Sequence, residues 1–212
     1  MRDLLAQDIL LGYSTGIFPM AKTKTSKELY WVKPKKRGVI PIGGLHISKS
    51  LRKFIRSEDL HMSLNQSFLN VLNHCANRED TWINDELHKI YLELYQLGHA
   101  ISIEVWSNNK LIGGLFGVKI GSCFCGESMF SISKNGSKLA MIVTMGLLRY
   151  NNFTLFDTQF MTEHLKTMGG SEITQTDYEK QLTIATTHNR NFSNFPNNYS
   201  WPEIIQLNNH KL

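Results

Sequence analysis

Two carboxylates stand in otherwise apolar segments of this chain, and they are the first side chains to consider for chemistry. Glu127 lies in Gly-Glu-Ser-Met-Phe-Ser at 126–131, and Asp157 lies in Leu-Phe-Asp-Thr-Gln at 155–159. Charged groups are seldom buried in apolar strands unless they have a partner or a chemical task. Gln159 follows Asp157 by two positions, so the two side chains share one face of an extended strand. For Asp157, the residues alone also allow a simpler role, a strand-end carboxylate that caps a loop.

A helix between two strands positions these groups. The pattern predicts strands at 123–131 and 153–157 and a helix at 137–150, bounded by Asn135-Gly136 and Asn151-Asn152. One carboxylate therefore lies on each of two strands that the helix connects.

The first hundred residues are mainly helical by their apolar spacing. We expect helices at 3–12, capped by Asp3, at 48–56, capped by Ser48, at 63–77, and from Asn84 or Asp85 to Gly98. Short strands are expected at 30–32 and 38–40, and an apolar loop at 13–20.

From residue 100 the apolar period changes from 3.6 to 2. It predicts strands at 100–107, 110–120 and 123–131, with a hairpin turn at Asn108-Asn109. After the 137–150 helix and the 153–157 strand come a helix at 162–168 and a strand near Glu172. From residue 186 onward the chain is Asn-rich, and we expect it to be irregular. This order indicates an α+β fold with a mixed sheet and flanking helices, as in the acetyltransferase-like (GNAT) fold, whose splayed strands hold an acyl donor.

The positive charge of the chain is concentrated in one stretch. Residues 29–57 contain eight Lys or Arg residues and no Asp or Glu: Lys33, Lys35, Lys36, Arg37, Lys49, Arg52, Lys53 and Arg56. Such a patch suits a polyanion such as nucleic acid, but a solvated basic face with no partner fits the charges equally well.

The composition excludes several classes of protein. At 42% hydrophobic and 19% charged residues the 212-residue chain is of the globular type, and it has no apolar run of about 18 residues for a membrane span. The N-terminus does not have the pattern of a signal peptide. Cys75, Cys123 and Cys125 are too few for a disulfide framework, and the last two share a strand face as packed thiols rather than metal ligands. A reducing cytoplasm is the simplest location.

Seven segments in one collinear order, over about residues 4 to 182, resemble the leucyl/phenylalanyl-tRNA–protein transferase family. They are Gly16-Ile17-Phe18-Pro19-Met20, Leu45-His46-Ile47-Ser48-Lys49-Ser50-Leu51, Thr81-Trp82-Ile83, Gly98-His99-Ala100 with Ile103-Glu104-Val105-Trp106, Gly113-Gly114-Leu115-Phe116-Gly117-Val118, the 126–131 segment, and Asp157-Thr158-Gln159 with His164-Leu165.

The resemblance implies an enzyme that takes Leu or Phe, sometimes Met, from aminoacyl-tRNA. It joins that residue to the N-terminal Arg or Lys of a protein, which marks the protein for N-end-rule degradation. It also implies a small N-terminal domain, placed here at 1–60 with the basic helix, and an acetyltransferase-like domain at 61–185. The remainder, 186–212, would be the irregular tail.

By the same resemblance, Glu127, Asp157 and Gln159 hold the cationic acceptor residue and its amine. The donor ester is already activated, and the acceptor α-amine has an ordinary pKa of only about 7.7–8.0, so a modest proton acceptor suffices. An amide does not titrate usefully. Gln159 would therefore accept a hydrogen bond from the amine, while Asp157, or the substrate itself, would take the proton.

The resemblance also implies the donor contacts. Trp31 and Trp106 would sandwich the terminal adenine of tRNA, which suits every tRNA because stacking needs no sequence code. Trp82 and Trp201 would be structural. Leu115, Phe124, Met129 and Phe156 would form the apolar pocket for the aminoacyl side chain, and ordinary core packing is the alternative for each. Lys49, Arg52, Lys53 and Arg56 would contact tRNA phosphates.

We therefore expect aminoacyl-tRNA and proteins with N-terminal Arg or Lys as partners, no metal or other cofactor, no membrane, and a monomer. Two other functions stay open on the residues. An acyl-CoA-dependent N-acyltransferase would share the fold, although the turn at 134–137 has one glycine and is a poor pyrophosphate cradle. A non-catalytic RNA-binding module would use only the basic stretch.

Overall fold

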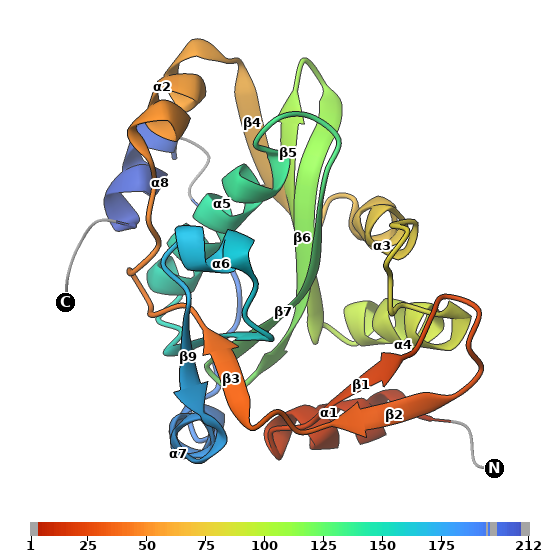
Figure 1. Ribbon diagram of the computed structural model, residues 1–212. Coiled ribbons are helices and arrows are strands. Elements are labelled where there is room, and N and C mark those ends of the chain that lie inside the picture. Colours follow the sequence, from red (N-terminus) through yellow and green to blue (C-terminus); the bar gives the residue numbers. More distant parts are fainter. Residues whose placement is uncertain (1–3, 194, 196–198, 209–212) are drawn as a thin grey trace.

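A seven-stranded sheet runs through the centre of the molecule (Figure 1). This computed structural model describes residues 4–193, 195 and 199–208. In spatial order the strands are β4 (Leu60–Leu64), β5 (Ala100–Ser107), β6 (Lys110–Ile120), β7 (Cys123–Ser131), β8 (Leu155–Gln159), β3 (Lys36–Val39) and β9 (Ser171–Thr174). Neighbours are antiparallel except β7 and β8, which are parallel. A separate two-stranded sheet pairs β1 (Phe18–Ala21) with β2 (Leu29–Val32).

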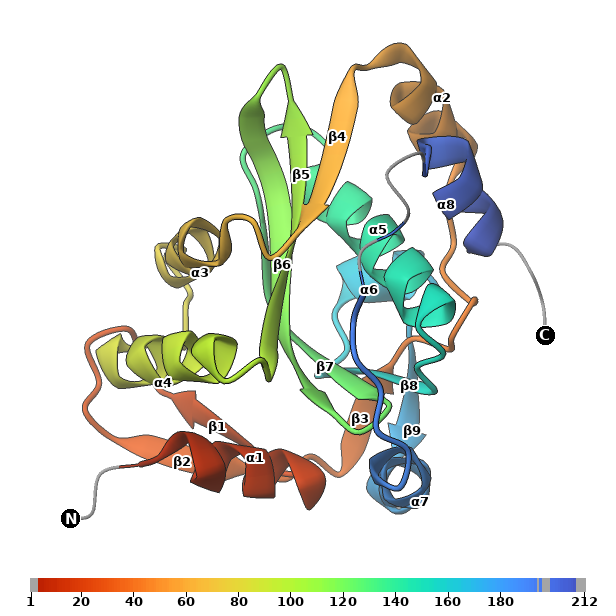
Figure 2. The same cartoon turned by 180° about the vertical axis from the view of Figure 1, so that it is seen from behind.

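Helices cover both faces of the large sheet, and each face has its own apolar core (Figure 2). One face carries α1 (Ala6–Ser14), α3 (Phe68–Ala76), α4 (Asp85–Gln96) and α7 (Gln175–Thr186). The other carries α2 (Lys49–Ser57), α5 (Gly136–Tyr150), α6 (Glu163–Thr167) and α8 (Trp201–Leu207). The chain is thus an α+β protein with a mostly antiparallel sheet and flanking helices.

The two strands that carry the candidate residues separate part-way along their length. The parallel pairing joins Cys123–Cys125 to Leu155–Asp157. Beyond it β7 continues along β6, and β8 continues along β3. Glu127 and Gln159 both lie past this point, so their backbones diverge while their side chains remain within reach of each other.

Helix α5 connects the diverging strands and is largely buried. Its first turn lies against β6 so closely that a Cβ on Gly113 would stand 2.4 Å from the carbonyl carbon of Gly136. The Ser131 hydroxyl, at the end of β7, accepts a hydrogen bond from the Ser137 amide at 3.2 Å. This packing ties the start of α5 to the end of β7.

Most of the expected elements form. The cap on α2 is the Ser48 hydroxyl, which accepts from the Leu51 amide at 3.2 Å, and the β5–β6 turn has left-handed Asn108 and Asn109. The alternating segments give the three expected strands. Asp3, the expected cap of the first helix, lies outside the described residues; α1 begins after Leu5, whose amide is bound by the Asp8 carboxylate.

Four elements were not expected from the sequence: β1, β4, α7 and α8. The helix expected at 63–77 begins only at Phe68, because residues 60–64 form edge strand β4 instead. The apolar loop at 13–20 contributes β1, and a further helix, α7, follows β9.

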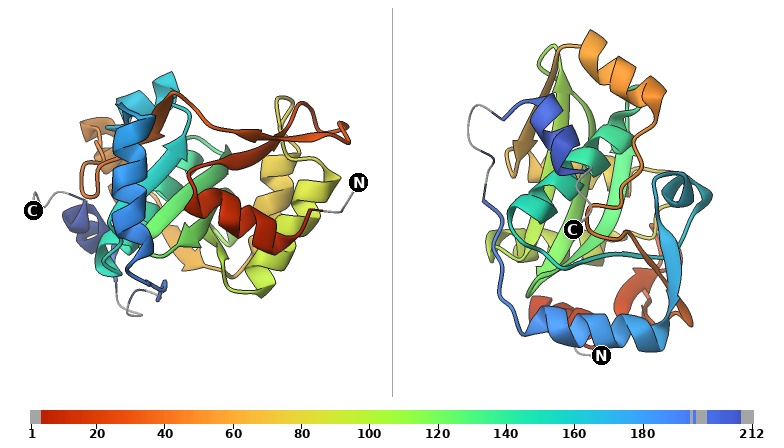
Figure 3. Two further views of the ribbon diagram at one scale, coloured as in Figure 1. Left: turned by 90° about the horizontal axis from the view of Figure 1, so that it is seen from below. Right: turned by 90° about the vertical axis from the view of Figure 1, so that its left-hand side faces the viewer.

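The expectation of an irregular tail is wrong at its end, where α8 forms with a Ser200–Glu203 capping box. Helix α8 lies beside α5 (Figure 3, right).

The domain division at residue 60 remains a prediction. Strand β3 belongs to the first 60 residues, yet it pairs between β8 and β9 in the large sheet. Part of the expected N-terminal domain is therefore built into the sheet of the expected catalytic domain. Among the described residues no helix has the length and apolar character needed to cross a membrane.

Candidate active site

A cavity of about 760 Å³ opens where β7 and β8 diverge. Its walls come from both strands, from α6, from the start of α5, and from β1 with the segment before α4. Glu127 and Gln159 line it, whereas Asp157 is not among its described lining residues. The structure therefore divides the three expected catalytic residues into two at the cavity and one behind it.

Glu127 is held by hydrogen bonds from two sides. Tyr91 on α4 donates to Oε2 at 2.8 Å, and the Gln159 amide donates to Oε1 at 3.1 Å. The residue is only 9% exposed. Burial raises the pKa of Glu127 from 4.5 to about 7, against the hydrogen bonds of Tyr13 and Tyr91, which lower it. The site thus contains a carboxyl group that titrates near neutral pH.

Asp157 is fully buried in a two-pronged ion pair with Arg37 of β3. Arg37 Nε donates to Oδ1 at 2.8 Å, and Nη2 donates to Oδ2 at 2.6 Å. Tyr178 also donates to Oδ2 at 2.9 Å, and the Gln159 backbone amide donates to Oδ1 at 2.9 Å. Both carboxylate oxygens are therefore bound by the protein itself.

Arg37 corrects one expectation about the basic stretch. It is fully buried, bonds the Gly16 carbonyl at 3.0 Å, and stacks its guanidinium 4.2 Å from the Tyr178 ring centre. Burial lowers its pKa, but the charge and hydrogen bonds of Asp157 outweigh this and raise it above the ordinary value. Arg37 is thus a permanent internal cation, and it does not belong to a surface patch.

Gln159 has a strained backbone. Its φ is +53°, in the left-handed region that residues other than glycine seldom adopt. The Asp157 carboxylate supports this conformation by accepting the Gln159 amide, and the side chain then reaches Glu127. Strained residues of this kind cluster at functional sites.

Two buried tyrosines complete the network, and sequence reasoning missed both. The hydroxyls of Tyr13 on α1 and Tyr91 on α4 lie 3.1 Å apart, and the second binds Glu127. Burial and the nearby Glu127 charge raise both tyrosine pKa values, so these hydroxyls stay protonated. By its sequence Tyr91 falls in the amphipathic helix expected from Asn84 or Asp85 to Gly98, and Tyr13 falls in the apolar loop expected at 13–20. Neither pattern distinguishes a hydrogen-bonding tyrosine from a packed one.

The expected side-chain pocket is assembled in part. Leu115, Met129 and Phe156 line the cavity. Phe124 is fully buried and packs behind Phe156 with ring centres 5.8 Å apart, so it supports the wall instead of forming it.

The two expected stacking tryptophans do not come to this cavity. Trp31 lies on β2 and packs on α1, where a Cβ on Gly12 would stand 2.2 Å from its ring. Trp106 lies on β5 beside edge strand β4 and donates to the Ser63 hydroxyl at 2.9 Å. Neither ring is among the described lining residues.

Trp82, expected to be structural, does line the cavity. Its ring meets Tyr91 edge-on at 6.1 Å, and its carbonyl accepts from the Ala21 amide of β1. The signal that could have identified it is its place in the Thr81-Trp82-Ile83 segment, one of those that resembled the family.

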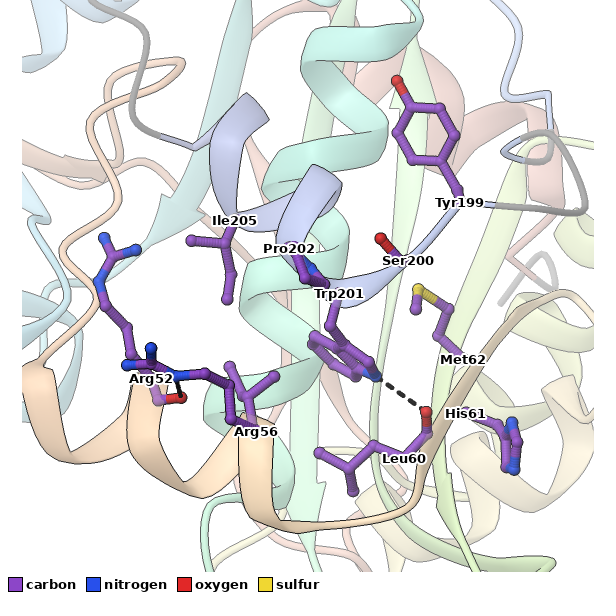
Figure 4. Close-up of a pocket in the computed structure, with 11 residues that line it drawn as sticks. Arg52, Arg56, Leu60, His61, Met62, Tyr199, Ser200, Trp201, Pro202 and Ile205 are labelled. Atoms are coloured by element: carbon purple, nitrogen blue, oxygen red, sulfur yellow. Dashed lines mark hydrogen bonds between the residues drawn. The ribbon is translucent and has the colours of Figure 1, made fainter.

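The basic face of α2 lies away from this cavity. Lys49, Lys53 and Arg56 are exposed, and Arg52 is half-buried with its Nε donating to the Ile47 carbonyl at 3.3 Å. Arg52 and Arg56 border a second cavity of about 810 Å³, whose opposite wall is α8 with Trp201 (Figure 4). The four expected phosphate-binding residues therefore do share one helix.

Among the described residues, no cluster of three His, Cys, Asp or Glu side chains could hold a metal ion. The three cysteines are buried and free, with the sulfurs of Cys123 and Cys125 3.9 Å apart on one strand face.

Residues 39–183 match the family described as leucyl/phenylalanyl-tRNA protein transferase, and residues 2–35 match the N-terminal domain of that family. The chain belongs to this family. A transferase of that name from Cereibacter sphaeroides is 43% identical over 94% of this chain and 94% of its own length. One from Dinoroseobacter shibae is 47% identical over 85% of this chain and 82% of its own length.

Likenesses to solved structures are remote. The structure of L-PGS from Bacillus licheniformis has a TM-score of 0.40 and 15% identity, covering 76% of this chain and 55% of that chain. A likeness at this level assigns no fold class.

The two family matches divide the site between them. Glu127, Asp157 and Gln159 fall in the longer match, and Tyr13 falls in the N-terminal one. Arg37 lies in the short interval between them. The candidate site is therefore assembled from both matched regions and from the residues that join them.

Proposed function

We propose that this chain transfers Leu or Phe, with Met as a weaker donor, from aminoacyl-tRNA to the N-terminal Arg or Lys of proteins, which marks them for N-end-rule degradation. The observation that carries this function is the cavity in which Glu127 and Gln159 face an apolar wall, in a chain of the leucyl/phenylalanyl-tRNA protein transferase family. A carboxylate suits a cationic acceptor, and an apolar wall suits the Leu or Phe side chain.

The acceptor binds at the Glu127 end of the cavity. The carboxylate and the Gln159 amide are joined by a hydrogen bond of 3.1 Å, so both can contact one small polar group such as an α-amine. Asp157 acts from behind, since it holds the Gln159 backbone while Arg37 neutralises its charge. Positioned groups of this kind place the amine for attack on the ester carbonyl.

The donor binds along the apolar side. Leu115, Met129 and Phe156 contact the aminoacyl side chain, and Phe124 stiffens the wall from behind. Trp82 takes the stacking role for the terminal adenine that the sequence had given to Trp31 and Trp106, because it is the tryptophan that lines this cavity. The exposed side chains of α2 receive phosphates of the tRNA body.

The strand arrangement favours the acetyltransferase-like class. Four antiparallel strands, β4 to β7, are followed by α5 and by β8, which is parallel to β7 and then diverges from it. A donor cavity between splayed strands is the arrangement expected for that fold. The alternative donor, acyl-CoA, is disfavoured because the turn before α5 in this chain is not glycine-rich and is a poor cradle for a pyrophosphate. We propose that the enzyme acts in the cytoplasm, where aminoacyl-tRNA is available, and that it acts as a monomer.

The test is to incubate the purified protein with an Arg-starting peptide and one donor at a time: Leu-tRNA, Phe-tRNA, Met-tRNA or acetyl-CoA. Mass spectrometry should find a peptide heavier by one Leu or Phe residue, and unchanged peptide with acetyl-CoA. An Ala-starting peptide of the same remaining sequence is the matched control and should not react. Transfer from acetyl-CoA, or binding of tRNA with no transfer from any donor, would refute the proposed function.

A further inference from the structure

The two buried carboxylates of the site differ in what they can still bind. Asp157 accepts four hydrogen bonds from Arg37, Tyr178 and the Gln159 amide, and it is fully buried behind the cavity. Glu127 lines the cavity and accepts hydrogen bonds from Tyr91 and Gln159, and Tyr13 also interacts with its carboxylate. A carboxylate offers about four acceptor positions, so Glu127 keeps capacity for a substrate proton.

We propose that Glu127 takes the proton from the acceptor amine and that Asp157, with Arg37, is a positioning residue for Gln159. The inference rests on the proposed function, because it names the proton acceptor of that reaction. It differs from the expectation drawn from the sequence, which gave the proton to Asp157 or to the substrate itself.

The step balances without any further reactant. The neutral amine nitrogen attacks the ester carbonyl carbon and forms the C–N bond, and its surplus proton passes to the Glu127 carboxylate. The bond between that carbon and the ribose oxygen then breaks. The ribose oxygen takes the proton from Glu127, which returns to its carboxylate form, so the products are the lengthened peptide and tRNA with a free hydroxyl.

The groups around Glu127 make it suited to this exchange. Tyr91 from α4 and Tyr13 from α1 face it, and so do Asp157 and Gln159 from β8, Arg37 from β3, and Cys125 on its own strand. Burial raises the pKa of Glu127 to about 7, the tyrosine hydrogen bonds and Arg37 lower it, and Asp157 raises it. A base is most effective when its pKa lies near the working pH and near that of the group it deprotonates.

The experiment measures kcat/KM against pH for transfer of Leu to an Arg-starting peptide. The wild-type protein should show two rising limbs, one near the Glu127 pKa of about 7 and one for the α-amine at about 7.7–8.0. In Glu127→Gln the lower limb should vanish, and the rate should fall by about 10²–10⁴-fold, the usual contribution of a positioned base.

Three further variants distinguish Glu127 from its surroundings. Tyr91→Phe removes a hydrogen bond that lowers the Glu127 pKa, so the lower limb should move to higher pH. Asp157→Asn removes a charge that raises it, so the limb should move to lower pH. Glu104→Gln is the matched control: this buried carboxylate on β5 bonds Ser63, Ser102 and the Ser67 amide, and its loss should leave the lower limb in place.

Each outcome decides the matter. A lower limb that persists in Glu127→Gln but vanishes in Asp157→Asn would give the proton to Asp157. Near-wild-type turnover in Glu127→Gln would leave the substrate as its own base. If Glu127→Gln fails to fold, an unmoved limb in Tyr91→Phe overturns the inference. Absence of transfer by the wild-type protein would instead refute the proposed function.

Discussion

At the scale of single residues, the site depends on a continuous series of hydrogen-bonded side chains. Arg37 binds Asp157, Asp157 holds the Gln159 amide, and the Gln159 side chain binds Glu127. Each of these four buried side chains thus has a partner, which is the condition for burial without a large desolvation cost. Gln159 is the link that bears backbone strain, and Glu127 is the link that meets the cavity.

Two replacements of Gln159 should differ in stability although both abolish transfer. The φ of +53° costs about 1–2 kcal/mol for a residue with a Cβ, whereas glycine adopts it freely. We therefore expect Gln159→Gly to be more stable than Gln159→Ala by about 1 kcal/mol in urea denaturation. Both variants should lose transfer, since neither can bind the amine. Equal stability of the two would mean that the network relaxes the strain, and full activity in either would make Gln159 a bystander.

The titration of Glu127 should also appear in stability. Its pKa is raised in the folded protein, from 4.5 to about 7, so its favourable contribution is present in full below pH 4.5 and is lost as pH rises through 7. Glu127→Gln should match the wild type near pH 4 and exceed it at pH 8 by an unfolding free energy on the order of 2 kcal/mol. Urea denaturation across that range measures the difference. A difference that does not change with pH would mean that Glu127 stays ionised in the folded protein.

At the scale of single elements, α2 shows how one helix serves two purposes. Leu51 and Ile55 are buried against the core, and Lys49, Lys53 and Arg56 face solvent. The apolar face holds the helix in place, and the charged face is then available to a polyanion.

Reversing the charge of exposed side chains on α2 should weaken binding of the tRNA body and leave binding of the aminoacyl end unchanged. We expect Lys53→Glu with Arg56→Glu to raise KM for Leu-tRNA and to flatten its dependence on salt, because fewer counterions are released on binding. KM for a minimal donor such as leucyl-adenosine should be unchanged. The control is Lys89→Glu with Lys110→Glu, exposed on α4 and at the start of β6, which alters net charge equally. If KM for the minimal donor rises as well, α2 supports the fold and does not bind RNA.

At the scale of the whole molecule, the C-terminal helix packs against segments that are far from it in the sequence. Trp201 is 8% exposed, belongs to the core beneath α5, and donates its indole hydrogen to the Leu60 carbonyl at 2.9 Å. Figure 4 shows this bond at the wall of the second cavity, between α8 and β4. The helix thus connects the start of β4 to the apolar core that lies under α5.

Truncating Trp201 should lower the stability of the fold and leave the rate of transfer unchanged. Trp201→Ala should lower the unfolding free energy by about 3–5 kcal/mol, the usual cost of removing a large buried side chain. Turnover with leucyl-adenosine should stay at the wild-type value at temperatures where the variant is folded. Ile184→Ala, at a position on α7 that is 61% exposed, is the control and should change stability by less than about 0.5 kcal/mol. A loss of turnover without a loss of stability would place α8 in the reaction.

The sequence by itself determined the family, most of the elements, and five of the residues at the cavity: Leu115, Glu127, Met129, Phe156 and Gln159. The family was readable because its segments are long and collinear, and Glu127 and Gln159 stand in two of them. Elements such as β5 to β7 and α5 were readable because local spacing decides which face of a strand or helix is apolar. Short or edge elements such as β4 and α8 were not predicted, because their apolar patterns are too short to be told apart from those of the neighbouring segments.

Only the tertiary structure decided which charged and aromatic residues meet. Arg37 and Asp157 are 120 positions apart, and a basic stretch gives no sign that one of its members is buried. The same holds for Tyr13 and Tyr91, 78 positions apart, and for Trp82, which lines the cavity while Trp31 and Trp106 are not among its described lining residues. Side-chain type sets what a residue can bind, but its partner is set by packing between distant elements. That packing depends on the whole chain, so local pattern could not supply it.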